Sequence, residues 1–158
     1  MPTLEQRLQL IEDRFALQDL EANYAAHWDF CRSEQWAQLF AEDGYFEMLP
    51  AGPMQAFKAT GHQQLAQFCE QINRNWQGLH LMHPARLVID GNTASALIFF
   101  EFPHAMNDEA GHTRQGTTTG YYEVEYRRTD NGWRITARRE QPVFDNTSNS
   151  FSFKPSTD

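Results

Sequence analysis

Apolar positions change their spacing about halfway along this chain. In the first half they recur at three- and four-residue steps, the period of an amphipathic helix. From Leu79 onward they alternate with polar residues, the period of a strand. Helices followed by a run of strands predict an α+β fold, and the absence of a repeat or internal linker favours one domain. We expect this domain to cover residues 1–144 and a C-terminal tail to cover residues 145–158.

The first predicted helix runs from about residue 3 to residue 29. Thr3 and Gln6 match a capping box, in which each side chain bonds the other residue's backbone amide. One apolar stripe follows the cap and predicts the face that packs against the rest of the domain. Its members are Leu4, Leu8, Ile11, Phe15, Leu20, Tyr24 and Trp28.

The remaining pattern predicts two more helices and an antiparallel meander. A short helix follows Ser33, a short strand covers 45–49, and a second capping-box match at Thr60 and Gln63 opens a third helix. Four strands are predicted near 79–90, 93–105, 114–128 and 132–141. Helices packed on one face of a curved sheet would form a cone with a closed base and an open mouth.

Alternation along the strands predicts which side chains point into the cone. The polar residues placed on otherwise apolar inner faces are His83, His104, Tyr122 and Arg139. His80 falls on the opposite face from His83. A β-bulge would shift this parity and reverse the assignment beyond it.

Charge and composition exclude several classes of function. A net charge of −8 argues against nucleic acid or an anionic membrane as the main partner. No apolar run is long enough to span a membrane and no signal peptide is visible, so we expect a cytoplasmic protein. Cys31 and Cys69 are then expected to be free thiols. No metal site is expected, because His80 and His83 lie on opposite faces and no zinc motif occurs.

Several short motifs, taken in their order and spacing, resemble one family. They are Ala16-Leu17-Gln18-Asp19-Leu20 followed by Tyr24 and Asp29, Trp36, Gly61-His62, His83 ahead of Asp90-Gly91-Asn92-Thr93-Ala94, and Gly132-Trp133-Arg134-Ile135. Over about residues 4–144 the chain resembles the SnoaL-like branch of the NTF2-like superfamily, which has a cystatin-like α+β cone fold. Within it the chain is similar to scytalone dehydratase, bile-acid 7α-dehydratase and hexachlorocyclohexane dehydrochlorinase.

This resemblance implies a set of site residues. Asp29 and His83 stand where those enzymes have a catalytic Asp and His, and Tyr24 matches a tyrosine of the bile-acid enzyme. His104 matches a second histidine of scytalone dehydratase, and Tyr122 replaces its substrate-binding asparagine. The arginine of the dehydrochlorinase falls at Arg138 or Arg139, and strand parity favours Arg139.

These residue types suit β-elimination, which needs a base for a carbon-bound proton and assistance for the leaving group. A neutral His83 would be the base, and Asp29 would orient it and stabilise the imidazolium. Tyr24 could donate to a carbonyl or leaving hydroxyl, His104 could protonate the leaving group, and Arg139 could hold an anion. No cofactor is required. Each residue also has a structural interpretation: Tyr24 as core, His104 as solvated, and Arg139 as an ion-pair partner.

Two hypotheses follow. The first is a cofactor-free lyase of dehydratase type, or an isomerase that uses the same base, acting on a small hydrophobic cyclic molecule. The second is a non-catalytic protein that binds small molecules or supports an oligomer, like the β-subunit of ring-hydroxylating dioxygenases. The second predicts a cavity filled by side chains, or Asp29 and His83 out of hydrogen-bond reach. By resemblance we expect a homo-oligomer, a dimer or trimer.

Overall fold

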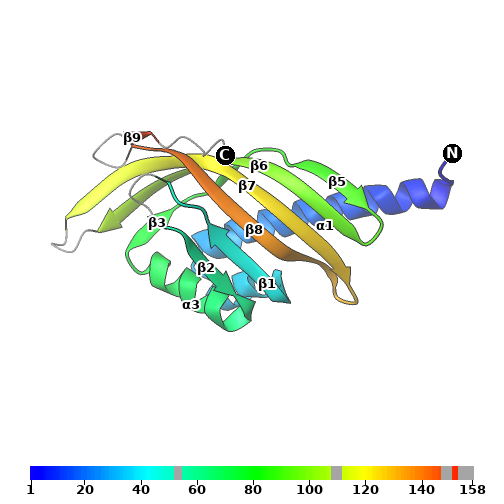
Figure 1. Cartoon of the computed structure of the whole chain (residues 1–158), viewed down its shortest axis with the longest axis horizontal. Coiled ribbons are helices and arrows are strands. Elements are labelled where there is room, and N and C mark those ends of the chain that lie inside the picture. Colours follow the sequence, from blue (N-terminus) through cyan, green and yellow to red (C-terminus); the bar gives the residue numbers. More distant parts are fainter. Residues whose placement is uncertain (52–54, 108–111, 147–150, 153–158) are drawn as a thin grey trace.

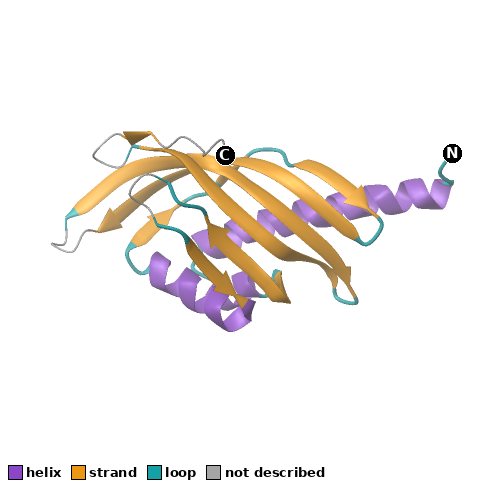
Figure 2. Cartoon of the chain, in the orientation of Figure 1, coloured by secondary structure: helices purple, strands orange, loops and turns teal. Residues whose placement is uncertain are grey.

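The computed structural model describes residues 1–51, 55–107, 112–146 and 151–152. Within these ranges, three helices pack against one face of a curved sheet (Figures 1 and 2). The helices are α1 (Leu4–Asp29), α2 (Ser33–Ala37) and α3 (Gly61–Asn73). The strands are β1 (Phe40–Met48), β2 (Phe57–Thr60), β3 (Trp76–Gly78), β4 (Leu81–Met82), β5 (Arg86–Asp90), β6 (Thr93–Asn107), β7 (Thr113–Thr129), β8 (Gly132–Asp145) and β9 (Phe151–Ser152). The predicted α+β cone is confirmed.

The strand order of the sheet is β2-β1-β8-β7-β6-β3, with β4 and β5 also paired to β6 and β9 paired to β8. Strands β5 to β8 form the predicted antiparallel meander, and β1 adds to it in parallel beside β8. The turns after β5 and β7 place Gly91 and Gly132 at positive φ, where glycine avoids the Cβ clash of other residues.

Helix α1 starts with the predicted capping box but buries only part of the predicted stripe. The Gln6 backbone amide donates to the Thr3 hydroxyl over 3.2 Å, and the Thr3 backbone amide donates to the Gln6 side-chain oxygen over 2.9 Å. The stripe is buried from Leu20 onward. Its first four members, Leu4, Leu8, Ile11 and Phe15, are exposed. Figure 1 gives the reason: the N-terminal end of α1 projects past the edge of the sheet, so no element covers it.

The second predicted capping box is wrong. Helix α3 does begin after Thr60, but the Thr60 side chain makes no capping bond. The Thr60 backbone amide instead donates to the Gln64 side chain over 3.0 Å, one residue beyond the predicted Gln63.

The predicted strand at 79–90 is interrupted between β4 and β5, and this changes its parity. Met82 pairs with Phe100 of β6, whereas Leu87 pairs with Ala96. From Met82 to Leu87 the chain advances five residues, while their partners on β6 are only four residues apart. The segment between β4 and β5 therefore contains one extra residue. Side chains before this irregularity switch faces relative to a regular strand. His80 consequently points inward and His83 points outward, the reverse of the prediction.

A second irregularity lies in β8. Tyr126 of β7 pairs with Ile135, but its neighbour Glu125 pairs with Ala137, so Thr136 is the extra residue. The parity of β8 changes there too. Trp133 and Ile135 point inward as predicted, while beyond the bulge Arg138 takes the inward position expected for Arg139.

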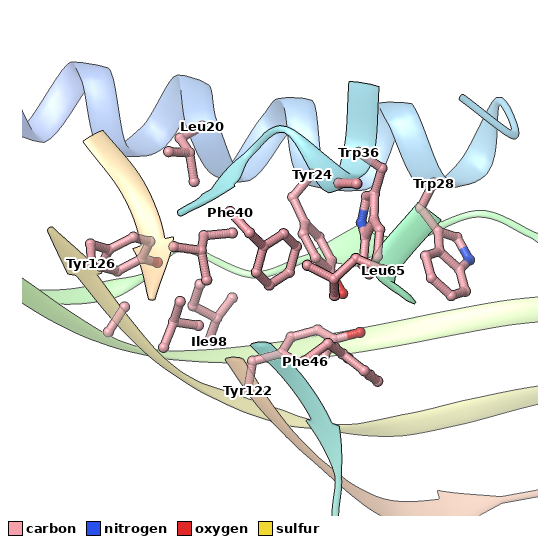
Figure 3. Close-up of a cluster of buried hydrophobic side chains, with 14 of the residues drawn as sticks. Leu20, Tyr24, Trp28, Trp36, Phe40, Phe46, Leu65, Ile98, Tyr122 and Tyr126 are labelled. Atoms are coloured by element: carbon pink, nitrogen blue, oxygen red, sulfur yellow. The ribbon is translucent and has the colours of Figure 1, made fainter. Parts of the chain in front are cut away.

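An aromatic cluster fixes α1 and α2 onto the sheet. The rings of Trp28 and Trp36 meet at 5.0 Å between centroids, and Trp36 lies 5.4 Å from Tyr24 and 5.1 Å from Phe40. Figure 3 shows Tyr24 and Trp28 reaching from α1 toward the sheet, where Phe46 and Tyr122 face them. Large rings packed at tilted angles bury much apolar area. The cluster therefore anchors the C-terminal half of α1.

Cys31 and Cys69 are free thiols, as predicted; the first is exposed and the second buried. No helix of the described part of the chain has both the length and the apolar character needed to cross a membrane.

Candidate functional site

A cavity of about 110 Å³ lies between the C-terminal half of α1, helix α3 and the inner face of the sheet. Its wall is mostly aromatic and aliphatic. The lining residues are Tyr24, Trp28, Phe46, Met48, Phe68, Ile72, Trp76, His80, Phe100, Phe102, Thr118, Tyr122 and Glu140. The cavity is therefore an apolar hollow with a few polar groups in its wall, which is the usual composition of a small-molecule site.

Asp29, the last residue of α1, forms two hydrogen bonds with His80, the residue directly before β4. The His80 ring Nδ1 lies 2.7 Å from Asp29 Oδ1, and the His80 backbone amide donates to Oδ2 over 2.8 Å. Both side chains are more than nine-tenths buried. Both carboxylate oxygens are thus engaged, and the ring is fixed in one orientation.

The environment keeps the His80 imidazole neutral and basic at one nitrogen. Burial lowers the pKa of His80, the Asp29 carboxylate opposes that shift, and the positive charge of Arg138 adds to it. Because Asp29 accepts at Nδ1, the single ring proton of neutral His80 lies on Nδ1. The free lone pair is then on Nε2, which faces the Tyr122 hydroxyl at 3.3 Å.

His83, which was predicted to pair with Asp29, lies outside the cone. Its side chain is half exposed, and its Nε2 is 3.5 Å from the carboxylate of the equally exposed Glu101. The inserted residue between β4 and β5 is the cause, since it turns His80 rather than His83 toward α1. The predicted Asp–His pair is therefore present with a different histidine.

Tyr24 and Tyr122 both lie in the cavity wall, as predicted. Tyr122 stacks on Phe100 at 4.5 Å, and Tyr24 meets the His80 ring edge-on at 6.1 Å. Burial raises the pKa of both phenols, while the positive charge of Arg138 acts in the opposite direction. Both hydroxyls are therefore protonated at neutral pH and can donate hydrogen bonds.

The inward arginine is Arg138, not Arg139. Its guanidinium is fully buried, lies 3.5 Å from the Tyr24 ring centroid and 3.9 Å from that of Tyr122, and contacts both carboxylate oxygens of Glu21 at 2.8 and 3.0 Å. Arg138 thus lies behind the two tyrosine rings, and its charge is balanced by Glu21 of α1.

Arg139 lies on the other face of β8. It bonds Glu125 over 2.9 Å, lies 3.8 Å from Glu47 and contacts the Tyr45 hydroxyl. Its predicted role in holding a substrate anion is therefore wrong in this structure, because the bulge at Thr136 turns it away from the cavity.

His104 is buried, as its inner-face assignment predicted, but it lies behind the cavity wall. Its Nδ1 donates to the Phe102 carbonyl oxygen over 2.8 Å, and its ring packs against Trp76 at 5.0 Å and Phe102 at 5.4 Å. Trp76 and Phe102 line the cavity, whereas His104 is absent from the described lining residues. Its assignment as a substrate-binding residue remains a prediction.

The sequence prediction missed His80 and Glu140 as cavity residues. Glu140 has the same parity as Arg138, so the bulge in β8 that moves Arg138 inward moves Glu140 inward as well. The resemblance to the dehydrochlorinase, whose arginine falls at Arg138 or Arg139, offered one signal for this. If Arg138 had been chosen as the inward residue, alternation would have placed Glu140 on the inner face as well. Among the described residues, no group of three His, Cys, Asp or Glu side chains is arranged to hold a metal ion.

Comparisons with known proteins agree with this fold. Residues 9–139 match the family model described as a SnoaL-like domain. The uncharacterized protein Rv2910c of Mycobacterium tuberculosis is 26% identical over 136 residues, which is 85% of this chain and 88% of that protein.

Two solved structures share the fold at lower sequence identity. A candidate scytalone dehydratase from Novosphingobium aromaticivorans matches with a TM-score of 0.74 and 21% identity, covering 95% of this chain and 96% of the other. The hexachlorocyclohexane dehydrochlorinase LinA-type3 from Novosphingobium barchaimii LL02 matches with a TM-score of 0.74 and 16% identity, covering 95% and 99%.

Proposed function

The chain belongs to the SnoaL-like family, and from that premise we propose that it is a cofactor-free lyase acting by β-elimination on a small hydrophobic cyclic molecule. The observation that carries the proposal is the buried Asp29–His80 pair at an aromatic cavity, with Nε2 of His80 directed at the Tyr122 hydroxyl. An isomerase would use the same base and return the proton to another carbon of the substrate.

The proposed reaction starts at a carbon acid, a C–H group next to a carbonyl. Nε2 of His80 takes the proton, and Asp29 stabilises the imidazolium that forms. The electron pair of the C–H bond becomes the new C=C bond, and the bond to the leaving group on the neighbouring carbon breaks. A Tyr24 or Tyr122 hydroxyl donates to the carbonyl oxygen, where negative charge develops.

Arg138 supports this role of the tyrosines without entering the cavity. Its guanidinium lies under both rings, and its positive charge lowers the pKa of each phenol against the effect of burial. A hydroxyl with a lower pKa is a stronger hydrogen-bond donor to a developing enolate. Arg138 would thus act as a positioning and polarising residue.

The composition of the cavity wall supports a hydrophobic cyclic substrate. Phe46, Phe68, Trp76, Phe100 and Phe102 offer flat apolar surfaces, and the Tyr122 hydroxyl lies 3.3 Å from His80 Nε2. A cyclic ketone with a leaving group on the β-carbon fits this arrangement, because its ring can pack on the aromatic side chains and its carbonyl can meet the hydroxyls.

The test uses 3-hydroxycyclohexanone, whose dehydration gives an enone that is followed by its ultraviolet absorbance. His80→Ala is expected to lower kcat/KM about 10²–10⁴-fold, the usual range for loss of a general base. His83→Ala is the matched control: it removes a histidine three residues away on the outer face and should react like the wild type. A folded His80→Ala variant with wild-type activity would show that the base assignment is wrong.

The predicted homo-oligomer also remains a proposal. Its support is the outer face of the sheet, where Val88 is 60% exposed and Phe99 is 55% exposed. Phe99 packs edge-on against Tyr121 at 6.2 Å on the same face. Exposed apolar surface of this kind is typical of subunit contacts, and sedimentation velocity of the full chain would measure the number of subunits.

A further inference from the structure

Glu140 of β8 brings a carboxyl group into the wall of the apolar cavity, beside Tyr122 of the neighbouring strand β7. In the sheet its Cα pairs with Tyr122 of β7 on one side and with Met48 of β1 on the other, and all three side chains line the cavity. The Tyr122 hydroxyl lies 3.3 Å from His80 Nε2, and it acts against the rise in the pKa of the Glu140 carboxyl. Tyr122 is therefore a neighbour of both the imidazole and this second acid.

Charge balance does not explain why an acid is present here. The nearby cation is Arg138, and Glu21 already contacts it with both carboxylate oxygens. The other groups that face Glu140 are the phenols of Tyr24 on α1 and Tyr122 on β7. An ionised Glu140 would add a further negative charge to a site that already holds Glu21 and Asp29. Its presence therefore calls for a role in which it carries a proton.

The protein environment favours the protonated form. Glu140 keeps some surface open where it lines the cavity but is otherwise enclosed by protein. Burial raises the pKa of Glu140 to about 7, and Arg138 and the Tyr122 hydroxyl limit that rise. Near neutral pH the site therefore holds a neutral imidazole and a carboxyl group of which about half is protonated, so that both the base form and the acid form needed at the start of a reaction are populated.

We infer that Glu140 is the general acid of this site, donating its proton to the leaving oxygen while His80 removes the carbon-bound proton. This inference rests on the proposed elimination and adds a catalytic residue to it. It also specifies the substrate as one whose leaving group is a hydroxyl, since hydroxide leaves poorly unless it is protonated as its bond to carbon breaks.

The proton balance of the step closes within the site. The C–H electron pair forms the C=C bond, the C–O electron pair stays on oxygen, and that oxygen takes the Glu140 proton and departs as water. The site is then left with a His80 imidazolium and a Glu140 carboxylate. Tyr122 can pass its hydroxyl proton to Glu140 and take the Nε2 proton of His80, which restores both starting forms for the next turnover.

The experiment compares two leaving groups in Glu140→Gln. Glutamine keeps the size of the side chain but supplies no ionisable proton. Elimination from 3-hydroxycyclohexanone should fall about 10²–10⁴-fold, whereas 3-acetoxycyclohexanone, which releases acetate without protonation, should lose far less. Glu101→Gln, on the exposed outer face, is the matched control and should keep the wild-type ratio of the two rates. An unchanged ratio in Glu140→Gln would overturn the inference.

A second measurement does not depend on turnover. Carbon-13 NMR titration of the glutamate carboxyls in the wild-type protein should show one group titrating near pH 7 that is missing in Glu140→Gln. A Glu140 carboxyl that titrates at the ordinary glutamate value would be ionised at neutral pH, which would also overturn the inference.

The pH profile separates this inference from the proposed function. The rate with the hydroxy ketone should fall above about pH 7 as Glu140 loses its proton, and fall in acid as His80 gains one. Glu140→Gln should lose the alkaline fall and keep the acidic one. Activity lost in His80→Ala but normal in Glu140→Gln would overturn the role of Glu140 alone. No elimination of either ketone by the wild type would overturn both proposals.

Discussion

Helix α1 carries two buried aspartates, Asp13 and Asp29, whose surroundings differ in one decisive respect. Asp13 accepts hydrogen bonds from Arg128, from the Trp133 indole over 3.2 Å and from the Gln9 amide over 3.2 Å. Burial raises the pKa of Asp13, but these bonds outweigh it, and the pKa lies below its ordinary value. Asp13 therefore stays ionised and fully bonded.

Asp29 faces a histidine instead of an arginine. A guanidinium keeps its proton at any pH at which the protein is folded, whereas an imidazole can gain or lose one near neutrality. The Asp13 network can accordingly only hold α1 to the sheet, while the Asp29 network can take part in proton transfer at the aromatic cavity. The partner of a buried carboxylate, more than the carboxylate itself, separates a structural contact from a candidate catalytic one.

The largest effect is expected from Asp29→Asn. The asparagine amide would donate to His80 Nδ1 and so favour the tautomer with its proton on Nε2, which removes the basic lone pair. Elimination from 3-hydroxycyclohexanone should fall about 10²–10⁴-fold in kcat/KM. Asp19→Asn changes an exposed aspartate of the same helix and serves as the control. Wild-type rates in Asp29→Asn would remove the distinction between the two aspartates.

The next effect concerns Glu21, the third buried acid of α1. Glu21→Gln removes the partner charge of the fully buried Arg138, and an uncompensated buried cation costs about 3–5 kcal/mol in the free energy of unfolding. Urea unfolding measures this value, with Glu12→Gln, at an exposed position of α1, as the control. If Glu21→Gln lowers the free energy of unfolding no more than Glu12→Gln does, the Arg138 charge is balanced by another group.

The smallest of the three effects is expected from Asp13→Asn. Loss of the carboxylate weakens the bonds from Arg128 and Trp133, which should lower the free energy of unfolding by about 1–3 kcal/mol. The elimination rate per folded molecule should not change, because Asp13 lies far along α1 from the cavity residues. Reduced kcat in a fully folded sample would contradict a purely structural role.

Much of this arrangement was predictable from local sequence signals. The capping box at Thr3 and the apolar spacing placed α1 within one residue of its observed bounds, and alternation identified the inner faces of β6 and β7. Asp29 and Tyr24 could be assigned to the site because both lie on α1. In a regular helix, the number of residues between two positions determines how their side chains are placed relative to each other.

His80, Arg138 and Glu140 could not be assigned in this way. Each lies next to a point where the pairing register of a strand shifts by one residue. A single inserted residue leaves the polar–apolar pattern nearly unchanged but exchanges the two faces of the strand. The sequence alone supported His83 and Arg139 for that reason.

The sequence by itself determined the order of helices and strands and the acid at the end of the first helix, since these depend on contacts between residues close along the chain, and its order of elements and its resemblance to a family indicated the α+β cone. Only the tertiary structure decided which histidine meets that acid and which charged side chains of β8 face the hollow. Those choices depend on how distant strands align with one another, and that alignment is set by the packing of the whole sheet.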